Sequence, residues 1–317
     1  MPPATRASLS EIREAANRIA GVILETPLVP LQDEALGENI WLKPEMLQPI
    51  GSFKLRGVYN AVACLSAEER RRGLSTVSAG NTAQALAWSG RRFGVPARSL
   101  MPDTAPRSKI DAVRQYGGEA VLVPVPELFR FLEERRWESE PYAFVHPWTD
   151  RRVMTGHASL GLEIVEACPD VDSVFISVGG GGLIAGVASA LRALKPEVRI
   201  FAVEPEGCAA LHASFEAGCA TRVDCRTFSD GVAVPYTTPE MYPLLRELVD
   251  EVVLVSEADT RAAIRRLAMG NKLVAEGAGA LPLAAALSVA SGVRGTSICV
   301  LGGGSLDSDK LARILDA

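Results

Sequence analysis

The chain has 317 residues, 48% of them hydrophobic and 22% charged, and its formal net charge is -5. This length favours two domains, and the composition is typical of a globular protein. The negative net charge argues against nucleic acid as a main partner, because phosphate binding needs a basic surface. No apolar run reaches the length of a membrane span, and residues 1–8 show no apolar signal core, so we expect no membrane contact and a cytoplasmic location.

The cysteines show no pattern of a metal site or a redox pair. The chain contains six of them, with no CxxC pair and no histidine at zinc spacing. We therefore expect free thiols in a reducing compartment. They are Cys64, Cys168, Cys208, Cys219, Cys225 and Cys299.

The first half of the chain alternates between helical and strand patterns. Ser8 and Glu11 form a capping box, and apolar residues then recur at helical spacing as far as Ile19. Ser66 and Glu69 form a second capping box. The other expected elements here are strands at 40–42, 76–78 and 121–123, and helices at 52–62 and 83–93.

The second half repeats this alternation more strongly. Strands are expected at 174–178, 200–203, 252–255 and 298–301, and helices at 183–194 and from 256 towards 272. Continuous apolar strands separated by helices indicate parallel sheets covered on both faces. We therefore predict an α/β fold with two open, twisted parallel-sheet domains.

A glycine-rich segment follows the strand expected at 174–178. Gly179, Gly180, Gly181 and Gly182 stand between this strand and the next helix. Glycine brings backbone N–H groups close to an anion, and a helix N-terminus favours negative charge. We therefore predict a phosphate site; a dinucleotide site stays open as an alternative, because Glu204 lies near the distance of the acidic residue that such folds use.

Two further segments are weaker signals when taken alone. Lys54 follows an aromatic residue at a helix start, where burial would favour the neutral, nucleophilic amine. Residues 78–84 carry small polar side chains between a strand and a helix, where a carboxylate could bind. Most lysines are solvated, however, and an ordinary helix cap would also explain residues 78–84.

The combination of motifs resembles the fold-type II pyridoxal-phosphate family, in particular threonine and serine dehydratases and serine racemase. The shared motifs follow the family's order through nearly the whole chain. They are Thr26-Pro27-Leu28, Lys43-Pro44-Glu45, Gly51 to Gly57, Ser78 to Gln84, His146-Pro147, Gly161 to Ile164, Gly179 to Gly182, Glu204-Pro205, Glu276 to Gly279 and Gly302 to Gly304.

The resemblance implies a cofactor, pyridoxal 5'-phosphate, and a role for each matching residue. Lys54 would hold the cofactor covalently and then remove the α-proton of an amino acid substrate. The implied cofactor-binding residues are Phe53, Lys54, Asn81, Gly179, Gly180, Gly181, Gly182, Leu183, Glu276 and Gly302. The implied substrate-binding residues are Ser78, Ala79, Gly80, Asn81, Thr82 and Gln84.

The resemblance also implies an arrangement of the chain. A large cofactor-binding domain would comprise residues 1–47 and 147–317, and a small domain, residues 48–146, would carry the substrate loop, residues 78–84. A homodimer is the family's commonest state. We expect no metal ion, because Ala210 stands where relatives have a second carboxylate beside Glu204, and we interpret Glu204 as structural.

The implied reaction is the dehydration of a β-hydroxy amino acid such as L-threonine or L-serine, or of a bulkier relative such as phenylserine or 3-hydroxyaspartate, to a 2-oxo acid and ammonia. Gly302 replaces a hydroxyl or thiol residue that faces the pyridine nitrogen, which favours β-elimination over racemisation. Ala79 replaces the second base of serine racemases, and Thr82 replaces a histidine common in dehydratases. Racemisation, β-replacement and non-catalytic cofactor binding stay open as alternatives.

Overall fold

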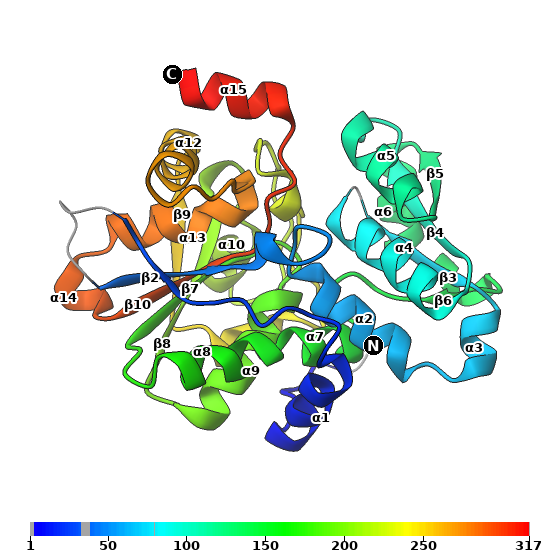
Figure 1. Cartoon of the computed structure of the whole chain (residues 1–317), viewed down its shortest axis with the longest axis horizontal. Helices are drawn as coiled ribbons and strands as arrows, with labels where there is room; N and C mark the ends of the chain where they lie inside the picture. Colours follow the sequence, from blue (N-terminus) through cyan, green and yellow to red (C-terminus); the bar gives the residue numbers. More distant parts are fainter. Residues whose placement is uncertain (1–2, 33–38, 79, 317) are drawn as a thin grey trace.

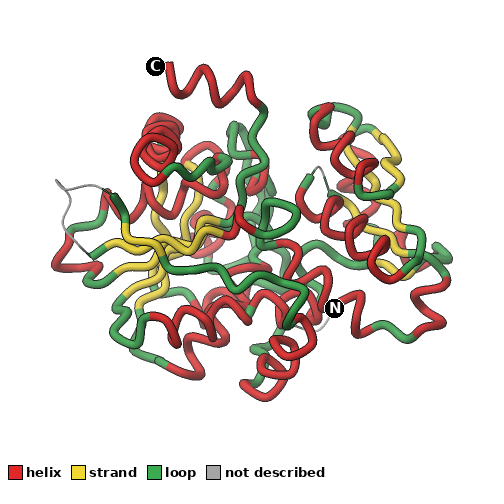
Figure 2. The backbone as a smooth tube through the Cα atoms, viewed as in Figure 1, coloured by secondary structure: helices red, strands yellow, loops and turns green. Residues whose placement is uncertain are grey.

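The computed structural model describes residues 3–32, 39–78 and 80–316. Within that part, the strands form two separate sheets (Figures 1 and 2). The six-stranded sheet has the spatial order β1 (Val29–Pro30), β2 (Ile40–Pro44), β10 (Ser297–Leu301), β7 (Ser173–Ser177), β8 (Arg199–Pro205) and β9 (Glu251–Val255). The four-stranded sheet has the order β5 (Glu119–Val123), β4 (Ala97–Pro102), β3 (Leu74–Val77) and β6 (Ala143–Phe144).

Fifteen α-helices connect and cover these strands in the described residues. They are α1 (Leu9–Ile19), α2 (Lys54–Cys64), α3 (Ala67–Arg71), α4 (Asn81–Phe93), α5 (Arg107–Gln115), α6 (Val125–Glu133), α7 (Arg151–His157), α8 (Ser159–Ala167), α9 (Gly182–Leu194), α10 (Ala210–Ala217), α11 (Tyr242–Leu248), α12 (Glu257–Arg266), α13 (Gly277–Ser288), α14 (Ser291–Arg294) and α15 (Ser308–Asp316). Short 3-10 or π turns are η1 (Glu45–Leu47), η2 (Arg136–Ser139), η3 (Glu206–Cys208), η4 (Asp230–Val232) and η5 (Leu267–Asn271).

The strand pairing confirms the predicted α/β architecture. Every pair in both sheets is parallel except β1 with β2, which is antiparallel and joins Val29 to Leu42. All five residues of β7 are buried. A strand covered on both faces needs apolar side chains on both, which is why its sequence is continuously apolar rather than alternating.

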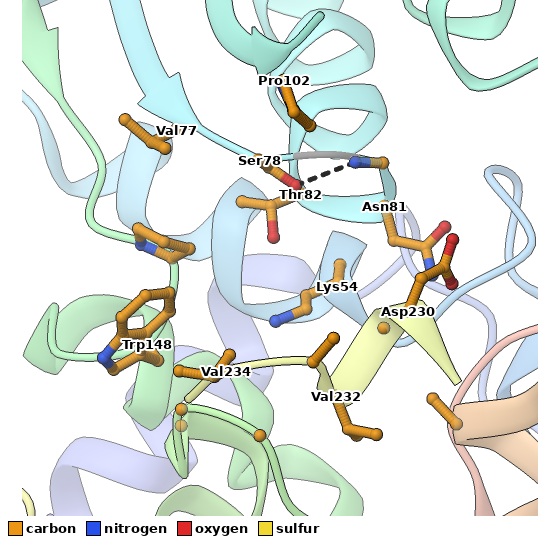
Figure 3. Close-up of a pocket in the computed structure, with 18 of the residues that line it drawn as sticks. Lys54, Val77, Ser78, Asn81, Thr82, Pro102, Trp148, Asp230, Val232 and Val234 are labelled. Carbon is orange, nitrogen blue, oxygen red and sulfur yellow. Dashed lines mark hydrogen bonds between the residues drawn. The ribbon is translucent and has the colours of Figure 1, made fainter. Parts of the chain in front are cut away.

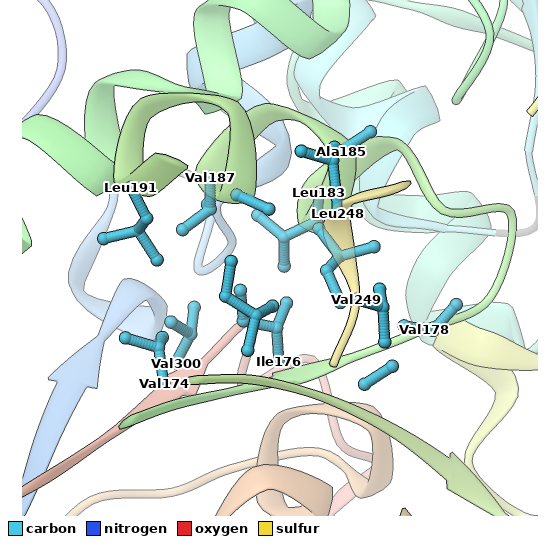
Figure 4. Close-up of a cluster of buried hydrophobic side chains, with 14 of the residues drawn as sticks. Val174, Ile176, Val178, Leu183, Ala185, Val187, Leu191, Leu248, Val249 and Val300 are labelled. Atoms are coloured by element: carbon cyan, nitrogen blue, oxygen red, sulfur yellow. The ribbon is translucent and has the colours of Figure 1, made fainter. Parts of the chain in front are cut away.

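The six-stranded sheet has a hydrophobic core on each face. On one face Val174, Ile176 and Val300 pack under Val187 and Leu191 of α9, with α8 and α11 beside it (Figure 4). On the other face, the alternate residues of the same strands pack against α12 and α13. This alternation follows from the two-residue period of a strand, which sends successive side chains to opposite faces.

The four-stranded sheet is covered in the same way by α2 and α4 on one face and α6 on the other. Helix α2 also packs against α7, which belongs to the segment that follows this sheet in the chain. Lys54, the first residue of α2, therefore lies where the two sheets approach each other (Figure 1).

Both capping boxes predicted from the sequence are present. The hydroxyls of Ser8 and Ser66 accept the N–H groups of Glu11 and Glu69, whose carboxylates accept the N–H groups of the two serines. Each therefore begins its helix, α1 or α3, as predicted. In the described residues no helix combines the length and the apolar character that a membrane span requires.

The prediction of free thiols is wrong for two cysteines. Cys208 and Cys225 form a disulfide, although 17 positions separate them. The N–H of Arg226 donates to the carbonyl of Gly207 at 2.7 Å, and this contact brings the two segments together. The spacing of these cysteines in the sequence does not predict such a pair. A disulfide also argues against the expected cytoplasmic location, because reducing compartments disfavour disulfides.

Candidate active site

A cavity of about 390 Å³ lies between the two sheets. This volume is within the range of small-molecule sites, roughly 300–1,000 Å³. The segments at the carboxyl ends of β3, β7 and β10 all contribute to it, as is usual for ligand sites of open parallel sheets. The predicted site residues that line it are Phe53, Lys54, Ser78, Gly80, Asn81, Thr82, Gly179, Gly180, Gly181, Gly182, Leu183, Glu276 and Gly302.

Of the other two predicted residues, the structure describes only one. Gln84 is buried within α4 and does not line the cavity. Ala79, the position of the missing second base, lies outside the described residues. The remaining substrate-loop residues surround the start of α4, beside Lys54 (Figure 3).

The glycine loop, residues 179–182, is shaped so that side chains cannot fit. A Cβ added to Gly180 would lie 2.3 Å from the Trp148 ring, and one at Gly182 would lie 2.9 Å from the Trp148 backbone. Gly181 has φ 87°, a left-handed conformation that suits glycine. Helix α9 begins here, and its first N–H groups have no partner within the helix. The loop therefore offers backbone donors to an anion, in agreement with the predicted phosphate site.

The residue before Lys54 is tied to the end of a neighbouring strand. The N–H of Phe53 donates to the carbonyl of Gly302 at 3.0 Å, which ties the start of α2 to the end of β10. The Lys54 amine lies 4.9 Å from the centre of the Phe53 ring and points into the cavity, towards the side of Trp148 (Figure 3). Burial lowers the pKa of Lys54 to about 8, against the opposing effect of the Glu276 charge. A neutral amine is thus accessible near physiological pH.

Asn81 and Glu276 form a second polar group in the cavity. Asn81 Nδ2 donates to Glu276 Oε1 at 2.8 Å, and burial raises the pKa of Glu276 to about 7. In the described part of the chain, Asn81 Oδ1 and Glu276 Oε2 are buried without a hydrogen-bond partner. Buried polar atoms are rarely left unpaired, so this arrangement fits a bound ligand.

A third polar group, Lys109 with Asp230, was not predicted. Lys109 of α5 and Asp230 of η4 both line the cavity, and their charged atoms are 2.6 Å apart. Burial disfavours the charged form of Lys109, but the carboxylates of Glu276 and Asp230 outweigh it and raise its pKa. No motif could have revealed this pair, because 121 positions separate its members.

Glu204 lies away from the cavity and has a structural role. Its two oxygens accept the N–H groups of Leu211 and His212, each at 2.8 Å, at the start of α10. The carboxylate is therefore engaged at a helix N-terminus, in agreement with our structural interpretation. The described residues hold no cluster of three or more His, Cys, Asp or Glu side chains that could bind a metal ion.

Comparisons with known proteins agree with this geometry. The model of the family "Pyridoxal-phosphate dependent enzyme" matches residues 19–303. L-threonine ammonia-lyase of Thermotoga maritima is 40% identical over 98% of this chain and 78% of its own length. The catabolic L-threonine dehydratase TdcB of Escherichia coli K12 is 36% identical over 97% of this chain and 95% of its own.

Solved structures give the same result. A threonine deaminase of T.th. superposes with a TM-score of 0.88 at 36% identity, over 95% of this chain and 99% of its own. Maize serine racemase has a TM-score of 0.90 at 31% identity, over 98% of this chain and 97% of its own. The family match covers most of the chain, and both curated relatives exceed a third in identity over nearly all of it. This chain belongs to the pyridoxal-phosphate-dependent enzyme family.

Proposed function

We propose that this chain is an ammonia-lyase that dehydrates a β-hydroxy amino acid to a 2-oxo acid and ammonia. The observation that carries the proposal is the Lys54 amine, which points into the same cavity as the glycine loop of residues 179–182. The relatives named threonine ammonia-lyase and threonine dehydratase support this reaction. Pyridoxal phosphate is the cofactor of the family.

The residues of the cavity fit pyridoxal phosphate. The N–H groups at the start of α9, which have no partner within the helix, would hold its phosphate, and the absence of side chains at positions 180 and 182 makes room for Trp148 against the loop. Phe53 and Gly302 would lie beside the ring, and Asn81 would bind its phenolic oxygen. The unpaired oxygens of Asn81 and Glu276 support a polar ligand at this end. Lys54 would hold the cofactor covalently.

The chain's own groups can carry out the proton transfers. When bound, pyridoxal phosphate acts as an electron sink that stabilises negative charge at the substrate's α-carbon. Lys54 Nζ would accept the α-proton, and its lowered pKa makes the neutral amine available for this step. The β-hydroxyl would leave as water, and the proton that it takes up balances the α-proton accepted by Lys54. Hydrolysis of the resulting enamine by a second water molecule gives the 2-oxo acid and ammonia.

The substrate loop can orient the amino acid through its carboxylate. The Ser78 hydroxyl accepts the N–H of Gly80 at 3.1 Å, so its own proton is free to donate. The start of α4 at Asn81 adds a helix N-terminus that favours negative charge. We propose that Ser78, Gly80 and Thr82 hold the carboxylate and thereby place the α-proton towards Lys54.

A second candidate function is amino acid racemisation. The likeness to maize serine racemase supports it. Racemisation needs a proton carrier on the face opposite Lys54, however, and alanine occupies position 79, where serine racemases have their second base. We therefore place elimination first.

The test is 2-oxo acid release from L-serine, L-threonine, threo-3-hydroxyaspartate and threo-phenylserine. We expect release from at least one substrate and its loss in Lys54→Ala, whereas Lys310→Ala in α15, outside the cavity, should retain full activity. A D-amino acid as the main product would favour racemisation. No turnover by a protein that still binds its cofactor would favour a non-catalytic binder.

Three expectations about the whole molecule remain predictions. We propose that residues 1–47 with 147–317 form a large cofactor-binding domain and that residues 48–146 form a small domain that carries the substrate loop. The strands of the four-stranded sheet all lie between Leu74 and Phe144, which supports this division. We also propose a homodimer and, although the disulfide between Cys208 and Cys225 points the other way, a cytoplasmic location; light scattering and cell fractionation would test these.

A further inference from the structure

We infer that the substrate of this site carries a bulky apolar group on its β-carbon, an aromatic ring or a branched aliphatic chain. This inference rests on the proposed function and names its substrate class. It disfavours serine and threonine, whose β-substituents are small, and 3-hydroxyaspartate, whose β-substituent is charged.

The cavity is divided into a polar and an apolar half. Lys109, Asp230, Asn81 and Glu276 gather at one end, next to the substrate loop. The opposite side is lined by what we call the apolar wall: Val77, Leu128, Phe129, Leu132, Trp148 and Val234. Figure 3 shows Val77, Trp148 and Val234 on the side of Lys54 that faces away from Asn81 and Asp230.

The wall is built from segments that are far apart in the sequence. Helix α6 contributes three of its side chains, and Phe129 of α6 makes an edge-on contact with Tyr236, 6.1 Å between ring centres. Tyr236 in turn contacts Trp148, with 6.5 Å between ring centres. Aromatic contacts of this kind have preferred geometries, so the wall is a formed surface rather than a set of loose side chains.

Each charged group of the cavity either has a partner at the polar end or takes part in the reaction. Among the described lining residues, the charged ones are Lys54, Lys109, Asp230 and Glu276. Lys109 forms an ion pair with Asp230, and Glu276 accepts a hydrogen bond from Asn81. Lys54 is the reacting amine. The described lining then leaves no cation beside the wall for a β-carboxylate, which would be buried unpaired there at a large cost.

The position of the substrate follows from the same division. If Ser78, Gly80 and Thr82 bind the α-carboxylate, the glycine loop holds the phosphate and Lys54 faces the α-carbon, the β-substituent points towards the part of the cavity that remains, which the apolar wall lines. The methyl group of threonine would leave most of this wall facing water. A larger apolar group would cover it, and in hydrophobic pockets even one methylene changes kcat/KM by roughly 10–200-fold.

The first experiment compares kcat/KM of the holoenzyme for L-serine, L-threonine, threo-3-hydroxyaspartate, 3-hydroxyleucine and threo-phenylserine. We expect phenylserine or hydroxyleucine to exceed threonine by at least about tenfold. A higher value for serine, threonine or hydroxyaspartate would overturn this inference and leave the ammonia-lyase intact. No release from any substrate would overturn both.

A pair of variants tests the wall itself. Phe129→Ala should lower the phenylserine-to-threonine ratio of kcat/KM by about tenfold. Leu122→Ala is the matched control, because Leu122 is an exposed apolar residue of β5 that does not line the cavity, and the ratio should stay constant. An unchanged ratio in Phe129→Ala would contradict the role of the wall.

A binding measurement does not depend on folding of a variant. L-phenylalanine and L-alanine lack the leaving hydroxyl and should bind without elimination. We expect L-phenylalanine to inhibit the holoenzyme at least about tenfold more tightly than L-alanine. Equal inhibition by the two would count against an apolar subsite.

Discussion

At the scale of single residues, the chemistry depends on how the cavity alters the charge of Lys54. An exposed lysine amine is almost wholly protonated at neutral pH and cannot act as a base. In this cavity burial disfavours the ammonium form, while the nearby Glu276 carboxylate favours it, and the net effect is a lowered pKa. The Glu276 charge itself varies near neutrality, because burial raises its pKa to about 7.

The lowered pKa of Lys54 predicts how the cofactor-free protein takes up pyridoxal phosphate. Only the neutral amine reacts, so the rate should rise with pH and level off above about 8, instead of rising towards 10.5 as for an ordinary lysine. Stopped-flow absorbance at a series of pH values measures this rate. A profile that rises without a break to about pH 10 would show that burial does not lower the pKa.

A variant of Glu276 provides the control for this profile. Since the Glu276 charge raises the pKa of Lys54, Glu276→Gln should move the midpoint of the profile below 8. A midpoint that moves up, or does not move, would mean that another group sets the charge of Lys54.

At the scale of secondary-structure elements, a buried ion network fixes the start of α2 and hence Lys54. Arg56, in the first turn of α2, pairs with Glu45 of η1 at 2.7 Å and with Glu163 of α8 at 2.5 Å. Lys43 of β2 pairs with the same Glu163 at 2.5 Å. Arg56 and Lys43 are each only 1% exposed. The network therefore joins α2 to three other elements, η1, β2 and α8.

This network predicts a large loss of stability when one member is removed. Glu45→Ala leaves the buried Arg56 with one carboxylate instead of two, so the free energy of unfolding should fall by about 3 kcal/mol. Urea unfolding followed by circular dichroism measures the change. Glu251→Ala removes the partner of Arg199 in an exposed pair and should cost less than about 1 kcal/mol. Equal losses in the two variants would contradict the importance of burial.

Sequence patterns predicted some of the strands and helices and missed others. Strands β7, β8 and β10 were predictable because both of their faces are buried, which makes their sequences continuously apolar. Strand β4 was not predicted, since Arg98 interrupts its apolar run, and the two residues of β6 are too few to form a pattern. Helix α5 was missed as well, because only three of its nine residues are buried.

The same distinction applies to the candidate site. The glycine loop follows a local pattern and was predicted from it, whereas Lys54 is a weak local signal and was assigned through the resemblance to a known family. The pair Lys109–Asp230 and the aromatic contact of Phe129 with Tyr236 depend on how distant segments meet. Periodicity and motif spacing carry no information about such contacts, and the disulfide between Cys208 and Cys225 escaped prediction for the same reason.

At the scale of the whole molecule, contacts around the cavity connect the two sheets. Lys109 pairs with Asp230, the Ser108 hydroxyl donates to the Asp307 carboxylate, and Arg222 pairs with Glu133. In each contact, one partner belongs to α5 or α6 and the other to a segment after residue 217. The substrate loop and the apolar wall both depend on these contacts between the two sheets, because the elements around the four-stranded sheet supply part of each.

These contacts predict that replacing Asp230 lowers kcat/KM by more than the accompanying loss of stability can explain. Asp230→Asn leaves Lys109 without its ion partner, so the substrate loop beside Lys109 loses its position and kcat/KM should fall about tenfold, which corresponds to about 1.4 kcal/mol. Steady-state release of the 2-oxo acid measures this change. Asp250→Asn is a closely matched control, because Asp250 pairs with Arg192 at the same 2.6 Å and with similar exposure, 39% against 37% for Asp230.

The two variants separate the effect of losing a contact between the sheets from the effect of losing stability. The pair Arg192–Asp250 lies on the side of the six-stranded sheet, between α9 and the start of β9, and does not line the cavity. Both substitutions should lower the free energy of unfolding by about 1 kcal/mol or less, because each aspartate is more than a third exposed. Only Asp230→Asn should lower kcat/KM. A similar fall in both variants would mean that lost stability explains the effect, and an unchanged kcat/KM in Asp230→Asn would mean that the substrate loop holds its position without the contact between the sheets.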